Sequence, residues 1–317
     1  MDKKSVIVTG ATSFIGNALI RQMLSEGEYK IFAVTSPDSG RKDSICKSGS
    51  VEIIESDLSG IDRILPDYTG KIDAIYHIGW SSRFDNARYN LDGQMQNAEY
   101  MERVITLADR LGCNKVLGVG SQAECGRVQE PITETTPDHP ETAYAVAKCR
   151  AYERAMELCG KYGIQFFWPR LLSAYGPNDK MRTMIMSCLH AAVCKEKIQF
   201  TACEQIWDYI YVDDAADALI GIVERGQCGV KYPIASGKGR RLAEYIADIA
   251  EITNAPFLVN GIGAKPYAKE QVMYLVGDIR RLCEDTGFAP KTDFRQGIRN
   301  TIHNNFTDRE DIISEKV

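Results

Sequence analysis

Residues 6–16 read Val-Ile-Val-Thr-Gly-Ala-Thr-Ser-Phe-Ile-Gly, and this stretch decides the fold. Residues 6–8 form a short β-branched run that predicts a strand, and Gly10 permits the tight turn after it. Apolar residues then recur at helical spacing from Ile15 to Gly27, which is a predicted C-cap. A strand that enters a glycine turn and opens a helix aims backbone N–H groups and the positive end of the helix dipole at an anion.

The loop has the composition of a turn that binds the pyrophosphate of a dinucleotide, with one departure. Gly16 permits close packing of the helix on the sheet, but the middle position, where a glycine usually admits a phosphate, is Ser13. A serine is small, and its hydroxyl either meets a phosphate or caps the helix through a backbone N–H. We therefore predict a dinucleotide site here in preference to a purely structural turn. Its residues are Gly10, Thr12, Ser13, Phe14, Ile15 and Gly16.

Short β-branched runs alternate with amphipathic helical stretches through the first two thirds of the chain. Further strands are predicted at residues 31–34, 51–54, 74–77, 115–119 and 164–168, with helices between them, as at 97–111 and 143–159. This alternation is typical of a parallel sheet that helices cover on both faces. We predict an α/β fold, a Rossmann-type doubly wound parallel sheet with a smaller C-terminal substrate-binding lobe.

The alternation weakens after Pro177, where a helix is predicted at 181–194, followed by a returning strand at 209–212 and a helix at 213–225. Two further helices are predicted at 242–253 and 293–302. We place the NAD(P)-binding domain at residues 1–173, with 204–234 returning to it. The substrate-binding lobe is then formed by residues 174–203 and 235–317.

The composition excludes several classes of function. The 317 residues are 44% hydrophobic and carry a net charge of −5 without any long Lys/Arg run, which argues against nucleic acid as a partner. Ten cysteines without a Cys-x-x-Cys motif and four dispersed histidines predict neither a disulfide scaffold nor a metal site. The N-terminus runs directly into a strand, leaving no room for a signal peptide, and no apolar run approaches the ~18 residues of a membrane span. We expect a soluble, cytoplasmic protein without a membrane partner.

The choice of dinucleotide depends on the end of the second strand, where an acidic side chain binds a ribose 2′-hydroxyl and a cation favours a 2′-phosphate. Thr35 and Ser36 stand there, Arg41 follows, and Asp38 is close enough to keep the alternative open. We favour NADP over NAD. After the third strand, Asp57 and Leu58 are predicted beside the adenine, although Asp57 is equally compatible with a simple turn.

Tyr144 and Lys148 are predicted to lie on one face of the helix at 143–159, because they are four residues apart. A free tyrosine has a pKa of about 10, so proton transfer near neutrality needs a neighbouring cation that stabilises the phenolate. Lys148 supplies that cation and is also placed to hold the nicotinamide ribose. Ser121 follows the preceding strand, so all three side chains are expected at the carboxyl edge of the sheet.

These residues resemble the extended short-chain dehydrogenase/reductase family of nucleotide-sugar epimerases, dehydratases and 4-ketoreductases. The resemblance covers nearly the whole chain and includes His77-Ile-Gly79, residues 90–97, Pro169-Arg170, Tyr175-Gly-Pro177, the run from Trp207 to Asp214, Asp278 and Gly287-Phe288. It implies that Ser121 polarises the sugar oxygen, that Tyr144 is the acid/base and that Lys148 tunes it. It also implies that Ile78 and Gly79 contact the cofactor, and that the helices at 97–111 and 143–159 form a homodimer contact.

Subfamily is indicated by the residues after Ser121. Dehydratases of this family carry an Asp-Glu pair there, one acid and one base, whereas this chain has Gln122-Ala123. Glu124 is displaced from that pair and is either a substrate hydrogen-bonding group or a strand-end charge bonded to a loop. Trp207 replaces an arginine that often clamps the substrate diphosphate, and Ser173 replaces a common asparagine, so Arg182 is one candidate for phosphate binding. The predicted substrate residues are Gln122, Glu124, Ser173, Arg182 and Trp207.

The resemblance and these departures together predict an enzyme that acts at C4 of a nucleotide-linked sugar, most simply a 4-ketoreductase. The first alternative is an NAD-dependent nucleotide-sugar 4-epimerase, which removes and returns a hydride. The second alternative is a catalytically silent NAD(P)-binding regulatory protein, because a fold never establishes a function. Trp80 and Arg83 either border the nicotinamide or pack in a loop, and His77 is interpreted as a hydrogen-bonded core histidine.

Overall fold

A six-stranded parallel sheet forms the centre of the protein, whose computed structural model describes residues 3–81 and 85–306. Its strands follow the order β3-β2-β1-β4-β5-β7. They are β1 (Lys4–Thr9), β2 (Tyr29–Thr35), β3 (Val51–Glu55), β4 (Ala74–His77), β5 (Lys115–Gly118) and β7 (Gln165–Phe167). Each overlaps one of the predicted strands, so the predicted Rossmann-type parallel sheet is confirmed. Arg83 lies outside the described residues.

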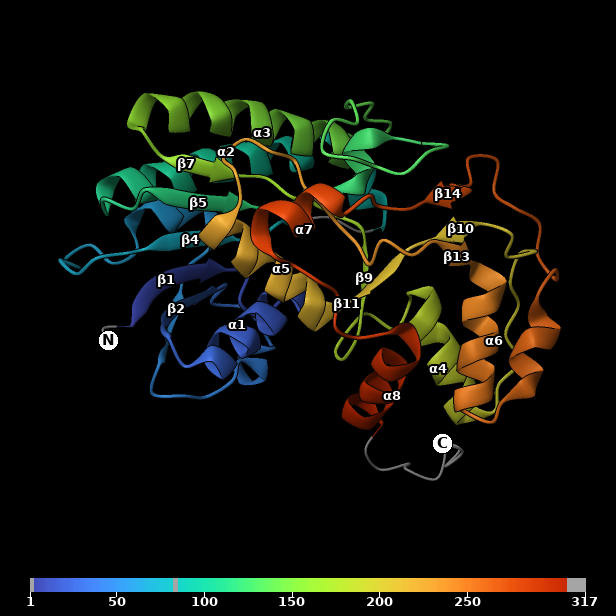
Figure 1. The fold of residues 1–317 in the computed structure, drawn as a ribbon. Coiled ribbons are helices and arrows are strands. Elements are labelled where there is room, and N and C mark those ends of the chain that lie inside the picture. The colour runs from blue at the N-terminus through green and yellow to red at the C-terminus, as the bar shows by residue number, and fades with distance from the viewer. Residues whose placement is uncertain (1–2, 82–84, 307–317) are drawn as a thin grey trace.

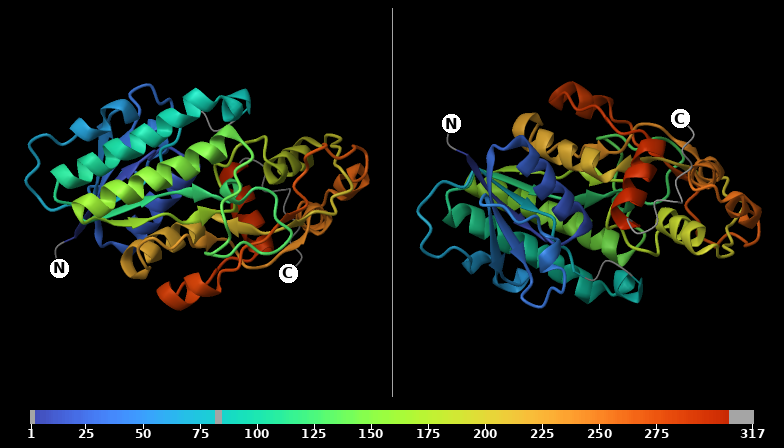
Figure 2. Two further views of the ribbon diagram at one scale, coloured as in Figure 1. Left: turned by 90° about the horizontal axis from the view of Figure 1, so that it is seen from above. Right: turned by 90° about the horizontal axis from the view of Figure 1, so that it is seen from below.

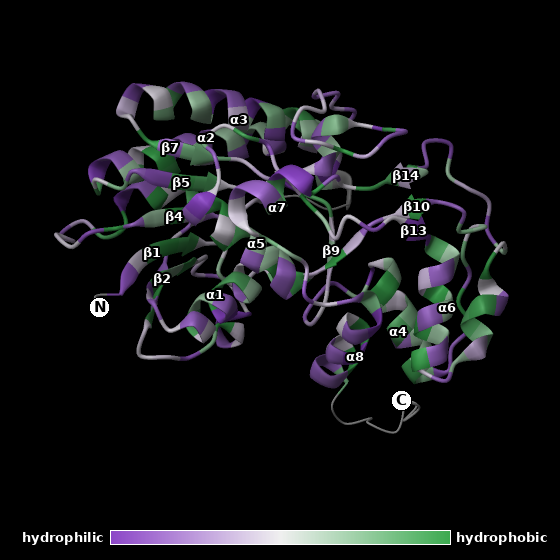
Figure 3. Ribbon diagram, viewed as in Figure 1, coloured by the Kyte–Doolittle hydropathy of each residue, from purple (hydrophilic) through white to green (hydrophobic). Residues whose placement is uncertain are grey.

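Helices cover both faces of this sheet (Figure 1). Helices α1 (Phe14–Glu26) and α5 (Val212–Arg225) pack on one face, and α2 (Leu91–Arg110) and α3 (Ala143–Tyr162) pack on the other. The reason is the alternation of side chains along each strand: Val6 and Val8 of β1 join the first core, whereas Ile7 joins the second. All three are buried, as strands covered on both faces require. Figure 3 shows the hydrophobic colour on inner strands such as β1, and alternating hydrophilic and hydrophobic colour along the helices that cover them.

Local signals set the helix ends. Ser13 caps α1 with its side chain, and Gly27 ends the helix in the left-handed conformation at φ 73°. Helix α2 begins at Leu91, earlier than the predicted residue 97, because the Asn90 side chain accepts a hydrogen bond from the Gly93 backbone N–H. The helix predicted from residue 181 begins later, as α4 (Met184–Cys194).

The strand order reverses beside β1, because the chain builds β2 and β3 on one side of it and then crosses to β4 on the other. The carboxyl ends of β1 and β4 therefore open a crevice at the position where sheets of this kind bind ligands. Strand β5 continues into the short β6 (Gly120–Ser121), which pairs with β8 (Arg170–Leu171) at the same edge.

A separate helical core lies beyond this edge (Figures 1 and 2). It combines α4 with α6 (Leu242–Ile252), η5 (Pro256–Gly261) and α8 (Phe294–Asn305). Strands β9 (Ser173–Tyr175) and β11 (Tyr209–Tyr211) pair in parallel between the two parts. The proposed domain boundaries remain a prediction.

This second part also contains a small sheet that the sequence patterns do not predict. Strands β10 (Ile206–Trp207), β13 (Arg240–Arg241) and β14 (Tyr274–Leu275) have two residues each, too few for a periodic pattern. The remaining elements are β12 (Pro233–Ile234), α7 (Arg280–Thr286), η1 (Lys42–Ser44), η2 (Leu58–Arg63), η3 (Asp85–Tyr89) and η4 (Gln122–Cys125). Across the part of the chain that the structure describes, no helix is both long and apolar enough to cross a membrane.

Candidate active site

The turn between β1 and α1 leaves no room for a side chain at either of its two glycines. At Gly10 the backbone has φ 66°, and a Cβ atom there would lie 2.7 Å from the backbone N of Gly79. A Cβ atom at Gly16 would lie 2.3 Å from the Gly10 carbonyl oxygen. The Ser13 hydroxyl accepts a hydrogen bond from the Gly16 N–H at 3.0 Å, which is the capping geometry anticipated for it. The helix N-terminus therefore faces the crevice with a small, closely packed turn, which fits a dinucleotide phosphate.

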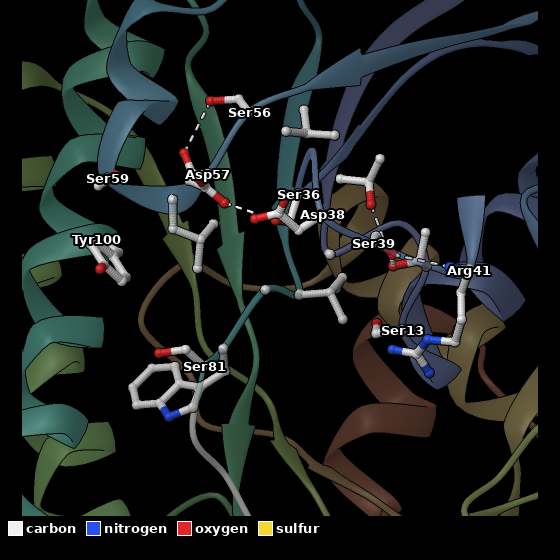
Figure 4. A pocket seen from close by; sticks show the side chains of 18 residues that line it. Ser13, Ser36, Asp38, Ser39, Arg41, Ser56, Asp57, Ser59, Ser81 and Tyr100 are labelled. Atoms are coloured by element: carbon white, nitrogen blue, oxygen red, sulfur yellow. Dashed lines mark hydrogen bonds between the residues drawn. The ribbon is translucent and has the colours of Figure 1, made fainter.

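A cavity of about 620 Å³ opens beside this turn (Figure 4). Its walls come from the carboxyl ends of β1, β2, β3 and β4. Most predicted cofactor residues line it: Gly10, Thr12, Ser13, Thr35, Ser36, Arg41, Asp57, Leu58, Ile78 and Gly79. Phe14 lines neither this cavity nor the one described below and instead packs against the sheet core.

The far end of this cavity holds both charges that bear on dinucleotide choice. Asp38 and Arg41 are exposed on its wall, and the Ser36 hydroxyl donates to Asp57 Oδ1 at 2.8 Å. The neighbouring cation, Lys42, already has an acidic partner, because its ammonium forms an ion pair with Glu55 at 2.6 Å. Among the described residues, the Arg41 guanidinium makes no hydrogen bond or ion pair.

A second cavity of about 190 Å³ contains the predicted catalytic residues. Ser121, Tyr144 and Lys148 line it together with Ile15 from the phosphate-facing turn. Ile78 and Trp80 line both cavities, so the two spaces share a wall at the end of β4. Residues far apart in the chain thus converge on the carboxyl edge of the sheet, as the sequence predicts.

Lys148 is buried and closely surrounded. Its ammonium donates to the Val119 carbonyl at 2.6 Å and lies 5.8 Å from the centre of the Tyr144 ring. It also lies 3.4 Å from the ring centre of Trp80, an interaction that no local pattern predicts. The Arg88 guanidinium lies 4.8 Å from the centre of the Tyr144 ring. Two cations therefore lie near this ring.

Ser121 is held by the short helix η4. Its hydroxyl accepts from the Ala123 N–H at 3.2 Å, and its own N–H donates to Glu124 Oε1 at 2.7 Å. The two bonds form a capping box, which fixes the serine at the rim of the small cavity.

Glu124 is fully buried and bonded to protein groups. Beyond Ser121, its carboxylate accepts from Trp168 Nε1 at 3.2 Å and pairs with Arg170 Nε at 3.5 Å. Burial raises the pKa of Glu124, while the Ser121 N–H and the charges of Arg170 and Lys148 oppose that rise. This geometry favours the loop-bonded alternative, and a substrate contact of Glu124 remains a prediction.

The other predicted substrate residues lie outside the two cavities, among the residues that the structure describes. Trp207 Nε1 donates to the Ser173 hydroxyl at 2.7 Å, so these two residues form one unit. Arg182 is exposed just before α4, and Gln122 is partly exposed on η4. Their roles remain predictions.

His77 is a buried, hydrogen-bonded histidine, as interpreted from the sequence. Its Nδ1 lies 2.7 Å from the Thr9 hydroxyl, and burial together with the charge of Lys148 lowers the pKa of His77 to about 3. Within the described ranges, no cluster of three or more His, Cys, Asp or Glu residues is arranged to hold a metal ion. The two adjacent acids at the start of α5 have protein partners: Asp213 pairs with Arg21, and Asp214 accepts backbone N–H bonds from residues 291 and 292.

A family model described as the NAD dependent epimerase/dehydratase family matches residues 6–235. The chain belongs to this family. Its most similar curated relatives include the dTDP-glucose 4,6-dehydratases of Mycobacterium tuberculosis and Escherichia coli, each 24% identical over alignments that cover 94% of this chain and 92% of the relative.

Similar solved structures agree on the fold of this family member. The UDP-N-acetylglucosamine 4-epimerase of Methanobrevibacter ruminantium M1 aligns with a TM-score of 0.85 and 21% identity over 98% of this chain and 100% of that one. The dTDP-glucose 4,6-dehydratase of Bacillus anthracis, in complex with NAD, aligns with a TM-score of 0.84 and 18% identity over 97% of this chain and 98% of that one.

Proposed function

We propose that this protein reduces the 4-keto group of a nucleotide-linked sugar with NADPH. The observation that carries the proposal is the meeting of Ser121, Tyr144 and Lys148 around one small cavity that shares a wall with the larger one. A nicotinamide bound across that wall would supply the hydride. Tyr144 then gives a proton to the C4 oxygen, the Ser121 hydroxyl polarises that oxygen, and the Lys148 ammonium stabilises the phenolate that remains.

Elimination of water is a poorer fit to this site. The positions that carry the acid and base of family dehydratases are Gln122 and Ala123, and neither side chain titrates. Glu124, the nearest carboxylate in sequence, is buried and accepts bonds from Ser121 and Trp168. Simple hydride exchange at one sugar carbon needs no such pair.

The preference for NADPH rests on the far wall of the larger cavity. Thr35 ends β2 without an acidic side chain, and the Arg41 guanidinium nearby has no partner among the described residues. A guanidinium fork suits the oxygens of a 2′-phosphate. Two observations support the alternative, NAD. Asp38 lies on the same wall, where a carboxylate suits a ribose 2′-hydroxyl, and a similar solved dehydratase was determined in complex with NAD.

A 4-epimerase is the second candidate, supported by the likeness along the whole chain to a solved 4-epimerase. The same three side chains serve both reactions, because an epimerase takes a hydride from C4 and returns it to the other face. A regulatory protein without catalysis is disfavoured, since Ser121, Tyr144 and Lys148 are all present and converge on one cavity.

The decisive experiment incubates the protein with a panel of nucleotide-linked 4-keto sugars and NADPH or NADH, and follows cofactor and product together. A reductase releases oxidised cofactor in equal amount with the product. An epimerase, supplied instead with nucleotide hexoses, inverts C4 with no net change in cofactor. Absence of both reactions across the panel would refute the proposal.

Tyr144→Phe tests the assigned acid/base. We expect cofactor affinity to be retained and turnover to fall about 10²–10⁴-fold, the usual contribution of a positioned acid or base. Tyr162→Phe, on the same helix and partly exposed, is the matched control and should leave turnover unchanged. Equal turnover in the wild type and Tyr144→Phe would remove Tyr144 from the mechanism.

We also propose that two copies associate through α2 and α3, as the family resemblance implies. Val146 on α3 is 39% exposed, and Arg150 and Glu153 stand near it on the same outer face. Sedimentation equilibrium of the wild type and of Val146→Glu tests this. A monomeric wild type would exclude the contact.

A further inference from the structure

Trp80 occupies a central place between the two cavities. It follows Gly79 at the end of β4, is only 8% exposed, and contributes to the walls of both the larger and the smaller cavity. The position of Trp80 after a strand and its residue type do not indicate a role, so we infer its role from its contacts.

The Trp80 ring carries the ammonium of Lys148 on its face. The Lys148 Nζ lies 3.4 Å from the ring centre, while the ring centre of Trp168 is 5.4 Å from the same atom. Tryptophan is the strongest aromatic partner for a cation, and the attraction grows when water is excluded. Lys148 is 5% exposed, so the interaction takes place in a desolvated site.

Trp80 is itself fixed from two directions. Its Nε1 donates to Gln94 Oε1 at 3.0 Å, and Gln94, fully buried in α2, donates through Nε2 to the Ala87 carbonyl at 2.9 Å. Its ring also meets Tyr144 edge to face, with ring centres 6.0 Å apart and planes at 78°. One rigid indole therefore contacts both members of the tyrosine–lysine pair.

We infer that Trp80 is a positioning residue that holds the Lys148 ammonium beside Tyr144 and so sets the pH at which this phenol ionises. The inference rests on the proposed function, in which Tyr144 exchanges a proton with the substrate. The ammonium donates to the Val119 carbonyl at 2.6 Å, and the indole face adds a contact from the segment that follows β4. Contacts from two different segments restrict the position of the lysine side chain more than either contact does.

Other charged or titratable groups also face this pair, and they are the same residues in the wild type and in the Trp80 variants. Arg88 on η3 lies 4.8 Å from the centre of the Tyr144 ring. Glu124 on η4 and His77 on β4 each interact electrostatically with Lys148. A change confined to the indole therefore isolates its own contribution.

The test is a pH titration of phenolate absorbance with saturating oxidised cofactor. The difference between the wild type and Tyr144→Phe reports the ionisation of Tyr144. In Trp80→Leu we expect the midpoint of the Tyr144 titration to rise by about one pH unit, because the ammonium that stabilises the phenolate is no longer held in place. Loss of a cation–π contact in a desolvated site changes an equilibrium constant roughly tenfold or more. Trp80→Phe keeps an aromatic face, so its midpoint should lie between the other two.

Phe32→Leu is the matched control. Phe32 is a buried ring with the Lys30 ammonium 4.8 Å from its centre, so its loss removes the same kind of contact at a distant place in the sheet. Its midpoint should equal that of the wild type. Trp80→Phe also keeps the test decisive if the leucine variant fails to fold.

The possible results separate the inference from the proposed function. If the wild type and Tyr144→Phe titrate identically through the neutral range, Tyr144 is not a tuned acid/base and the proposed function fails. If that difference is present but both Trp80 variants keep the wild-type midpoint, the positioning role of Trp80 is refuted while the proposed function stands.

Discussion

Acidification should weaken this fold through one buried side chain, His77 at the end of β4. The Thr9 hydroxyl accepts a hydrogen bond from the Gly79 N–H at 3.2 Å and lies 2.7 Å from His77 Nδ1. The other ring nitrogen, Nε2, is buried and has no hydrogen-bond partner among the described residues. Protonation of His77 therefore places a charge in a buried site where one of its two N–H groups has no acceptor.

The expected size of the effect follows from the shifted titration. Burial, with a contribution from Lys148, lowers the pKa of His77 to about 3 from its ordinary value of 6.5. Because the pKa of His77 is lower in the folded protein, its imidazole stays neutral between about pH 3 and pH 6.5, where the same side chain in the unfolded chain binds a proton. Stability from this group is complete above pH 6.5 and is lost as the pH falls from 6.5 towards 3. At pH 5 the loss is about 2 kcal/mol, at about 1.4 kcal/mol for each pH unit below 6.5.

The assay compares urea unfolding of the wild type and His77→Asn between pH 5 and 8. Asparagine does not titrate, and its amide keeps a polar group beside Thr9, so carboxylate contributions cancel in the comparison. We expect the wild type to lose about 2 kcal/mol more than the variant between pH 7 and pH 5. The other three histidines are exposed and are present in both proteins, so their titration also cancels in the comparison.

Two results would refute this reasoning. The first is an equal loss of unfolding free energy in the two proteins on acidification. The second is an imidazole resonance of His77 that titrates with the exposed histidines instead of staying constant down to pH 5.

Three further predictions concern Gly16, Glu124 and Arg41. Gly16→Ala should abolish cofactor binding measured by fluorescence titration of the protein with NADPH, because its Cβ would lie 2.3 Å from the Gly10 carbonyl oxygen. The control Gly40→Ala, where a Cβ meets nothing within 4 Å, should bind the cofactor normally in that assay. Glu124→Ala should lower the unfolding free energy by about 3 kcal/mol by removing one partner of a buried ion pair, and Glu124→Gln by less; equal urea midpoints for the wild type and both variants would contradict the buried pair. Arg41→Ser should raise the KM for NADPH about tenfold and leave that for NADH unchanged, whereas equal effects on both would exclude a 2′-phosphate contact.

The central sheet was predictable because its signals are local. Residues 6–8 alternate between the two cores, and Gly10 has the positive φ that the turn before α1 requires. The four-residue spacing of Tyr144 and Lys148 places both on one helix, and the helix observed from Ala143 brings both to one cavity. Each inference needed only a repeat, a turn residue or a spacing within about a dozen residues.

Other parts of the site depended on contacts between distant segments. Glu124 follows Ser121 closely enough to be taken for a substrate ligand, and only the approach of Trp168 and Arg170 shows that its carboxylate is bonded inside the protein. The position of Trp80 against Lys148 likewise joins the end of β4 to the middle of α3.

The sequence by itself determined the strands of the central parallel sheet and the helices that cover it, the phosphate-facing turn and the tyrosine–lysine pair, because each depends on residues close together in the chain. The tertiary structure alone decided which polar groups are buried and which face the cavities. The physical reason is that burial and ring-to-cation distances depend on how separate elements pack, and packing brings together residues such as Glu124 and Arg170, for which no periodicity or spacing exists.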